Sequence, residues 1–152
     1  MMTRLQAIRW FTSFVCNDKV ILTREKCEGT NFAMGIGDKQ PRLKLPKDLT
    51  TPYDIGDKLF RKSFTERYPM TKGFSTVTLT LLHECGHWHT RSVVNPSVYT
   101  TMIEQVISYE EYFNIPYERL ATDWAICWLS SPINRKIAKW FEESYFGYGK
   151  EQ

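Results

Sequence analysis

Residues 81–90 read LLHECGHWHT and contain the pattern H-E-x-x-H, formed by His83, Glu84 and His87. Residues four apart share one face of a helix, so both imidazoles can reach a single metal ion only if this stretch is helical. Glu84 then projects beside the ion, where it can exchange a proton with a zinc-activated water. The alternative is a pair of histidines that only form hydrogen bonds in a core. The apolar approach and the absence of proline favour the helix and the metal site.

Two of the three residues between the histidines, Cys85 and Gly86, affect how the helix packs. Gly86 has no side chain, so a helix can pack closely against a neighbouring element there. Cys85 is directed away from the two histidines by its position on the helix, so we expect it to pack rather than to bind metal.

A catalytic zinc ion has three protein ligands, and the pattern supplies two. The remaining histidine, His89, lies two residues beyond His87, about 200° around a helix, so it faces away from the ion and we expect it to be exposed. The third ligand should therefore be a carboxylate. The downstream candidates are Glu104, Glu110, Glu111, Glu118 and Asp123.

Glu118 has the most suitable surroundings among these carboxylates. It shares one helix face with residues that are mostly small, namely Ala121, Thr122, Ala125 and Leu129. Small side chains allow this helix to lie against the H-E-x-x-H helix. Glu104, in the middle of a helix predicted over 96–114, stays open as the alternative third ligand. Glu110 and Glu111 form an acidic helix end that is typical of solvated surface.

The N-terminal half predicts a small sheet. Residues 6–15 fit either a strand or a short helix, because their periodicity does not decide between them. One helical turn is predicted near 56–63. Strands are predicted within 19–25, 31–36 and 41–46, the last two around a turn.

From residue 74 onward the pattern is helical, with Ser75 as a cap and a β-branched run after it that leaves a strand as the rival. Further helices are predicted at 96–114, 116–131 and 132–146, each with proline in its first turn. We therefore expect an α+β fold, a small antiparallel or mixed sheet packed on a C-terminal helical bundle. It should form one domain over 1–152, with a sheet-containing half (1–73) and a helical half (74–152).

Composition excludes several classes of protein. The net charge of +3 is spread among interspersed acids, which argues against a dedicated nucleic-acid binder. No stretch has the length of a membrane span or a signal peptide. The four cysteines contain no C-x-x-C pair, which excludes a zinc ribbon, although Cys16 and Cys27 leave one disulfide open. We expect a reduced cytoplasmic protein with buried free thiols and no membrane partner.

The stretch ERLATDWAICWLSSP, residues 118–132, resembles the second motif of the ImmA/IrrE-type zinc metallopeptidases, E-x-x-A-N-x-F-A-x-x-L-L-x-P. Thr122 replaces the usual asparagine and Pro132 falls one position late. Trp124 stands for the motif's aromatic residue and Trp128 for a leucine. The direct matches are Glu118, Ala121, Ala125 and Leu129. Together with H-E-x-x-H the resemblance covers residues 75–132.

The resemblance implies a zincin-like fold similar to gluzincins such as thermolysin, with His83, His87 and Glu118 on zinc and Glu84 as general acid/base. A further residue should contact a ligand histidine, and Asp123 and Thr122 are the candidates. The group that stabilises the oxyanion is left open among several tyrosines, namely Tyr109, Tyr112, Tyr117 and Tyr145.

The expected function is a zinc-dependent endopeptidase that hydrolyses an intracellular protein or peptide, which the resemblance implies is repressor-like or linked to stress. A strand of the N-terminal half would pair with the extended substrate. The alternative is a non-enzymatic zinc-containing binding protein, such as a phage or mobile-element host-defence antagonist, although Glu84 counts against it. DNA-associated proteolysis is a third hypothesis, but related small proteases use a third histidine that this chain lacks.

Overall fold

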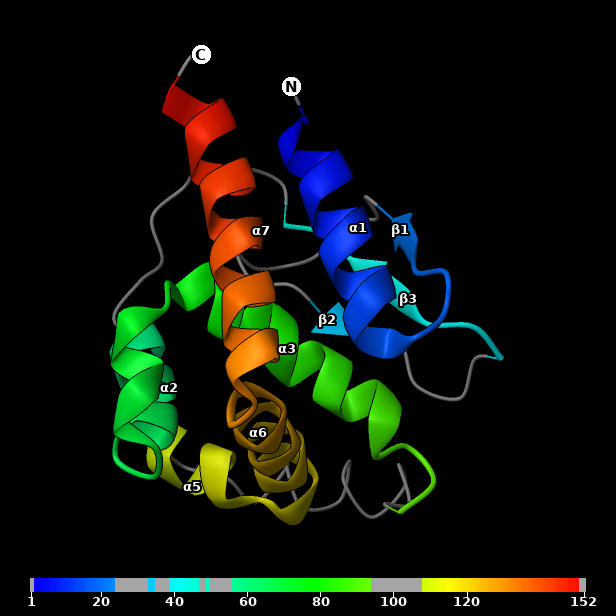
Figure 1. Ribbon diagram of the computed structural model, residues 1–152. Helices are drawn as coiled ribbons and strands as arrows, with labels where there is room; N and C mark the ends of the chain where they lie inside the picture. The colour runs from blue at the N-terminus through cyan, green and yellow to red at the C-terminus, as the bar shows by residue number, and fades with distance from the viewer. Residues whose placement is uncertain are drawn as a thin grey trace.

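A computed structural model describes residues 2–23, 33–34, 39–46, 49, 56–93 and 108–150 (Figure 1). It shows a small mixed sheet near the N-terminus followed by a mostly helical C-terminal part, which confirms the α+β prediction. The elements in chain order are α1 (Arg4–Cys16), β1 (Ile21–Thr23), β2 (Ala33–Met34), β3 (Arg42–Lys44), α2 (Gly56–Thr65), the 3₁₀ helix η1 (Pro69–Gly73), α3 (Thr76–His89), α5 (Tyr109–Asn114), α6 (Pro116–Leu129) and α7 (Pro132–Lys150).

The sheet is mixed, with β3 in the middle. β1 runs parallel to β3 and β2 runs antiparallel to it, in the order β1-β3-β2. Leu43 of β3 lies opposite both Leu22 and Met34 and is fully buried, so the centre of the sheet faces the core. Within the described strands, β2 is therefore an edge strand.

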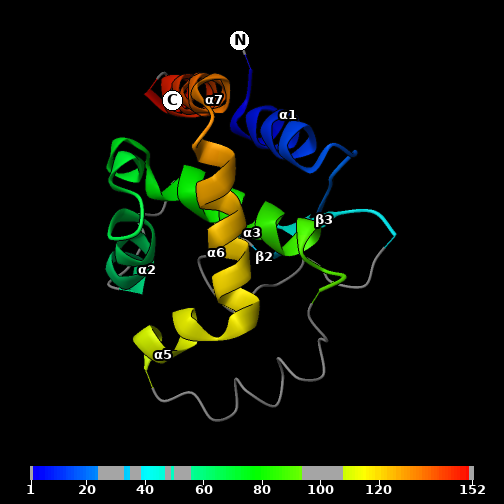
Figure 2. The same cartoon turned by 60° about the horizontal axis from the view of Figure 1, so that its bottom comes forward.

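The α3 helix is enclosed by the other elements. Ser75 caps its N-terminus by accepting a hydrogen bond from the Thr78 backbone, as predicted. Glu142 of α7 accepts further hydrogen bonds from the Ser75 N–H and the Thr78 hydroxyl. Helices α1, α2, α6 and α7 and strand β2 surround α3 (Figures 1 and 2). They bury most of the α3 side chains. This burial outweighs the low helix propensity of the β-branched start, so the rival strand does not form.

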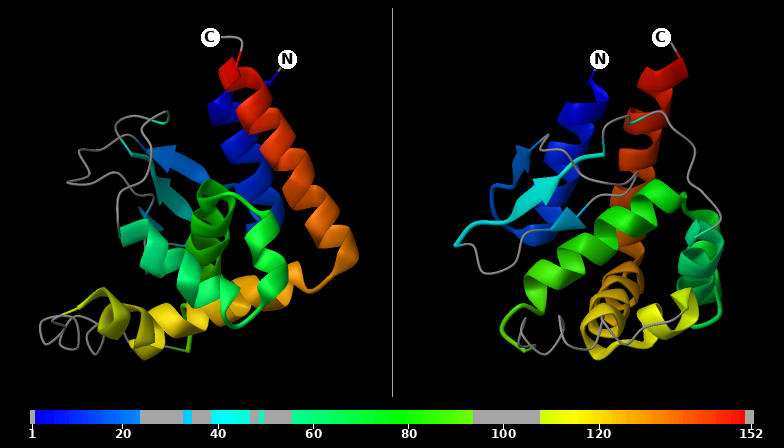
Figure 3. Two further views of the ribbon diagram at one scale, coloured as in Figure 1. Left: turned by 90° about the vertical axis from the view of Figure 1, so that its left-hand side faces the viewer. Right: turned by 180° about the vertical axis from the view of Figure 1, so that it is seen from behind.

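The ambiguous stretch at 6–15 is part of helix α1, which opens with a capping box between Thr3 and Gln6. α1 lies between the sheet and α7 in both views of Figure 3. Phe11 of α1 stacks on Phe141 of α7 with ring centroids 4.4 Å apart. The aromatic residues of the two chain ends thus join the helices into one layer.

The division into a sheet half and a helical half is less sharp than the composition indicates. Two helices, α1 and α2, lie within residues 1–73, and α2 is longer than the single turn predicted there. The hydrophobic core takes buried residues from both halves. In the described ranges, no helix combines the length and apolar character required to cross a bilayer.

Only the C-terminal part of the helix predicted over 96–114 is described, as the short helix α5. Ser108 caps it by accepting a hydrogen bond from the Glu111 backbone. Glu104, the alternative third ligand, lies outside the described residues.

Candidate metal centre

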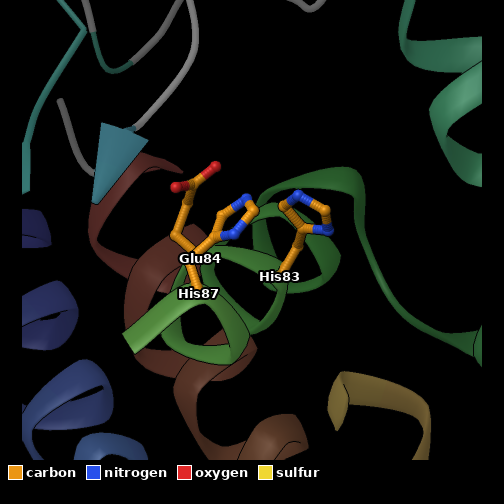
Figure 4. A group of neighbouring side chains, drawn as sticks. All are labelled: His83, Glu84 and His87. Atoms are coloured by element: carbon orange, nitrogen blue, oxygen red, sulfur yellow. The ribbon is translucent and has the colours of Figure 1, made fainter. Parts of the chain in front are cut away.

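His83 and His87 lie one turn apart on α3, and their side chains share one side of the helix (Figure 4). Both are buried, with 3% and 5% of their surface exposed, and their ring centroids are 4.6 Å apart. Ligand-type atoms of His83, Glu84 and His87 all lie within 4.8 Å of one another. These residues form a possible metal-binding group on a helix that is otherwise packed with apolar side chains.

Glu118 reaches this group from α6. Its Oε2 accepts hydrogen bonds from the Nε2 atoms of His83, at 2.7 Å, and of His87, at 3.2 Å. Its other oxygen, Oε1, accepts one from the Tyr112 hydroxyl at 3.1 Å. Two imidazole nitrogens and one carboxylate oxygen therefore converge from two helices on one buried point.

The convergence depends on how closely α3 and α6 approach each other. A Cβ atom at Gly86 would lie 2.3 Å from the carbonyl oxygen of Ala121, so only glycine fits there. The α6 face toward α3 includes the fully buried Ala121 and Ala125. The prediction that Gly86 permits close packing is confirmed, and the partner is the α6 backbone itself.

Each imidazole is oriented by a different set of neighbours. His83 Nδ1 lies 2.9 Å from the Thr122 hydroxyl, and its ring meets the edge of Phe60. His87 stacks on Tyr117 with centroids 4.2 Å apart. The buried Nδ1 of His87 has no hydrogen-bond partner among the described residues.

The Thr122 hydroxyl suits either state of His83, because a hydroxyl both donates and accepts. When Nε2 donates to Glu118, Nδ1 accepts from Thr122. If Nε2 were to bind a metal ion, the proton would lie on Nδ1 and would be donated to Thr122 instead. The same contact thus fixes the ring in both forms.

The carboxylate of Glu84 points toward the strand β2 of the sheet (Figure 4). Its Oε2 accepts a hydrogen bond of 2.7 Å from the backbone N–H of Met34 on β2. Burial raises the pKa of Glu84 to about 7, the charge of Glu118 adds to the rise, and the charge of His87 and the Met34 N–H oppose it. Glu84 can therefore gain or lose a proton near neutral pH.

Glu118 has the opposite electrostatic balance. Burial alone would raise the pKa of its carboxyl, but the hydrogen bonds and charges of His83 and His87 outweigh burial and hold the pKa well below its ordinary range. The two carboxylates near the histidines are thus driven apart in pKa. The Glu118 carboxyl therefore favours its ionised form, whereas the Glu84 carboxyl titrates near neutral pH.

Other residues singled out in the sequence lie elsewhere. Asp123 forms an ion pair with Arg67 at the surface, so the contact with a candidate ligand histidine belongs to Thr122. Glu110 and Glu111 lie exposed on α5. Tyr145 donates its hydroxyl hydrogen bond to a backbone carbonyl elsewhere, at Leu49.

His89 is not simply exposed, so that expectation was wrong. It is half-buried, its Nε2 donates a 2.8 Å hydrogen bond to the Val15 carbonyl at the end of α1, and its ring stacks on Trp124 of α6. It does face away from the metal group. His89 instead joins the C-terminal end of α3 to two neighbouring helices.

The described thiols are free. Cys85 packs in the core as expected, and burial together with the hydrogen bond that its thiol donates to Cys16 raises its pKa. Cys127 is exposed, which corrects the expectation that the thiols are buried. Cys27, and with it the open disulfide, lies outside the described residues.

Two contacts of the group were not foreseen from the sequence. The Met34 N–H donates to Glu84 although the two residues are 50 positions apart in the chain. Because every residue except proline has a backbone N–H, the residue type at position 34 does not indicate this contact. The sequence does not distinguish Tyr112 from the three other candidate tyrosines, whereas the structure shows its hydroxyl donating to Glu118. Only its position shortly before the Glu118 helix was a signal.

Neither a protein-family profile, nor a curated protein, nor a solved structure matches this chain. The resemblance to ImmA/IrrE-type metallopeptidases therefore rests on the residues of its two motifs. The structure adds that the H-E-x-x-H residues are grouped and largely buried, with Glu118 nearby.

Proposed function

We propose that this chain is a zinc-dependent endopeptidase in which His83, His87 and Glu118 hold the ion and Glu84 is the general acid/base. The observation that carries the proposal is the reach of Glu118 across the α3–α6 interface to the Nε2 atoms of both histidines. A pair of core histidines would not require an ionised carboxylate between them at a site this deeply buried.

The donor set suits zinc. Imidazole nitrogen and carboxylate oxygen are common zinc ligands, and tetrahedral ligands at about 2.1 Å from an ion lie roughly 3.4 Å apart. The Glu118 oxygen lies 2.7 and 3.2 Å from the two nitrogens, as hydrogen-bonded partners do. A shift of about 0.7 Å or less would make room for an ion. Thr122 supplies the outer hydrogen bond that a ligand histidine needs.

Zinc would supply Lewis acidity when bound, activating water and polarising the scissile carbonyl. Glu84 would take the proton of the attacking water on its carboxylate and later give it to the leaving amine. Its raised pKa matches that two-way task, and a bound cation would lower the pKa again. The Met34 N–H keeps the carboxylate oriented while the proton moves.

Tyr112 would position the third ligand. Its hydrogen bond to Oε1 of Glu118 leaves Oε2 directed at the two histidines. The single hydroxyl proton of Tyr112 is donated to Glu118, so Tyr112 would act on the ligand rather than on the reacting carbonyl.

The substrate would be an extended segment of a protein. β2 is one of the two edge strands of the described sheet, and it also carries the N–H that binds Glu84. A peptide paired along β2 would therefore lie beside the catalytic carboxylate. Main-chain pairing demands little sequence specificity. An intracellular protein is the substrate class we propose.

Metal analysis and paired glutamate variants test the proposal. The purified chain should contain about one zinc per molecule. Glu118→Gln should lower zinc occupancy, and Glu84→Gln should keep zinc but abolish cleavage of a fluorescence-quenched peptide library. The control Glu110→Gln, at an exposed glutamate of α5, should change neither.

Two outcomes would count against the enzyme. A wild-type chain that binds no zinc would contradict the metal site itself. A chain that keeps zinc but whose effect in cells survives Glu84→Gln would instead be the non-enzymatic binding protein.

A further inference from the structure

An open groove runs between η1 and α7, with a volume of about 450 Å³. None of the metal-group residues lines it. Its floor is Phe74, which is 5% exposed, and its two sides carry Met70, which is 49% exposed, and Trp140, which is 65% exposed. Tryptophan is among the residue types enriched where proteins bind each other tightly. The groove therefore offers a partner an apolar floor and an aromatic side.

The rim of the groove is predominantly cationic. Arg135, Lys136 and Lys139 line it, against one carboxylate, Glu143. The Arg135 guanidinium donates to neutral oxygens, a tyrosine hydroxyl and two backbone carbonyls, so these contacts do not neutralise its charge. Lys136 is exposed.

Lys139 is only partly neutralised. It lies 3.4 Å from Oε1 of Glu142, whose Oε2 accepts the hydrogen bonds from the N-terminus of α3. Its ammonium also lies 4.6 Å from the centroid of the Phe74 ring, so positive charge extends over the apolar floor. An occupant must combine apolar side chains with negative charge.

We propose that this groove docks an acidic amphipathic segment of a partner protein. An apolar side chain of that segment would pack on Phe74 between Met70 and Trp140, and its flanking carboxylates would face Arg135 and Lys136. Both the charge and the apolar character are needed, because a purely anionic ligand would leave Met70 and Trp140 uncovered. The surface is independent of zinc and of peptide-bond hydrolysis.

Fluorescence anisotropy with two labelled peptides tests the proposal. The probe is an amphipathic peptide of aspartate, glutamate and leucine, and its control has lysine at every acidic position. The acidic peptide should bind and the basic one should not. Trp140→Ala and Lys136→Glu should each weaken binding about tenfold or more. Phe14→Ala and Lys19→Glu, at an exposed aromatic residue and an exposed lysine outside the groove, should leave binding unchanged.

Several results would overturn the proposal. The first is that the acidic and basic peptides bind equally well, and the second is that the groove variants bind the acidic peptide as wild type does. The third is that the chain self-associates and Trp140→Ala abolishes this self-association. The fourth is that the chain binds phosphatidylserine vesicles in a Trp140-dependent way but does not bind the peptide. Lys136 is exposed, so Lys136→Glu tests the surface even if Trp140→Ala weakens the fold. Zinc content should be equal in all groove variants, so failure here and failure of the metal site are distinguishable.

Discussion

Replacing Gly86 by alanine should separate the two helices that carry the candidate metal ligands. The added Cβ would lie 2.3 Å from the Ala121 carbonyl oxygen and 2.9 Å from the Ala121 carbonyl carbon and Cα. Ordinary contact begins at 3.4 Å, so α3 and α6 must move apart by roughly 1 Å. The obstacle is backbone, so no side-chain rotation relieves it.

Two opposing effects set the change in the free energy of unfolding that Gly86→Ala causes. Alanine is favoured over glycine inside a helix by about 0.5–1 kcal/mol, and overpacking a buried contact costs about 1–3 kcal/mol. We expect the overpacking to dominate here, with a net loss of about 2 kcal/mol of unfolding free energy. For a chain of this size that lowers Tm by about 4–8 °C. Metal sites tolerate displacements of only about 0.5 Å, so zinc affinity should fall by about tenfold or more as Glu118 withdraws from the histidines.

Thermal unfolding of chelator-treated protein and a zinc titration against a competing chelator measure the two effects. Gly147→Ala is the matched control, because that glycine lies on α7 with open space around its Cβ position. It should raise stability slightly and leave zinc affinity unchanged. If Gly86→Ala is as stable as wild type and binds zinc equally well, the close α3–α6 approach does not hold the site together.

Two further predictions concern the polar contacts of the group. Thr122→Val keeps the shape of the side chain but removes the hydrogen bond to His83, so zinc affinity should fall about 10–100-fold in a chelator competition. Thr12→Val, at a buried α1 threonine, is its control, and equal effects of the two would contradict the role of Thr122. In metal-free protein, the folded chain retains the Glu84 proton up to a pKa of about 7, whereas the unfolded chain releases it near 4.5. Stability should therefore fall as pH rises through that window, by up to about 3 kcal/mol and less to the extent that water reaches the half-buried carboxylate. Urea unfolding at several pH values should show this fall in wild type and a smaller one in Glu84→Gln, and parallel curves would refute the assignment.

Much of the candidate site followed from local spacing. A separation of four residues places His83 and His87 on one helix face, and the same rule places Thr122 on the face of Glu118. Small residues around Glu118 indicated a close helix contact, and the structure locates that contact at Gly86 and Ala121. These inferences need only the period of a helix, which the backbone sets without reference to the rest of the chain.

The inferences that failed concern contacts across the fold. His89 was correctly placed on the far side of α3, but its burial depends on α1 and α6, which lie there. Spacing places Asp123 off the face of Glu118 but does not give its partner, and the structure pairs Asp123 with Arg67 while Thr122 contacts His83. The side a residue faces is local information, whereas what covers that side is not.

The sequence by itself determined which residue types lie on each helix face, and with them the candidate ligands and the α+β class. Only the tertiary structure decided how those faces meet. The burial of α3 raises the pKa of Glu84, the Met34 N–H from β2 orients its carboxylate, and Glu118 remains ionised between two imidazoles. The physical reason is that periodicity depends on the backbone alone. Desolvation and hydrogen bonding depend on every element packed around the group.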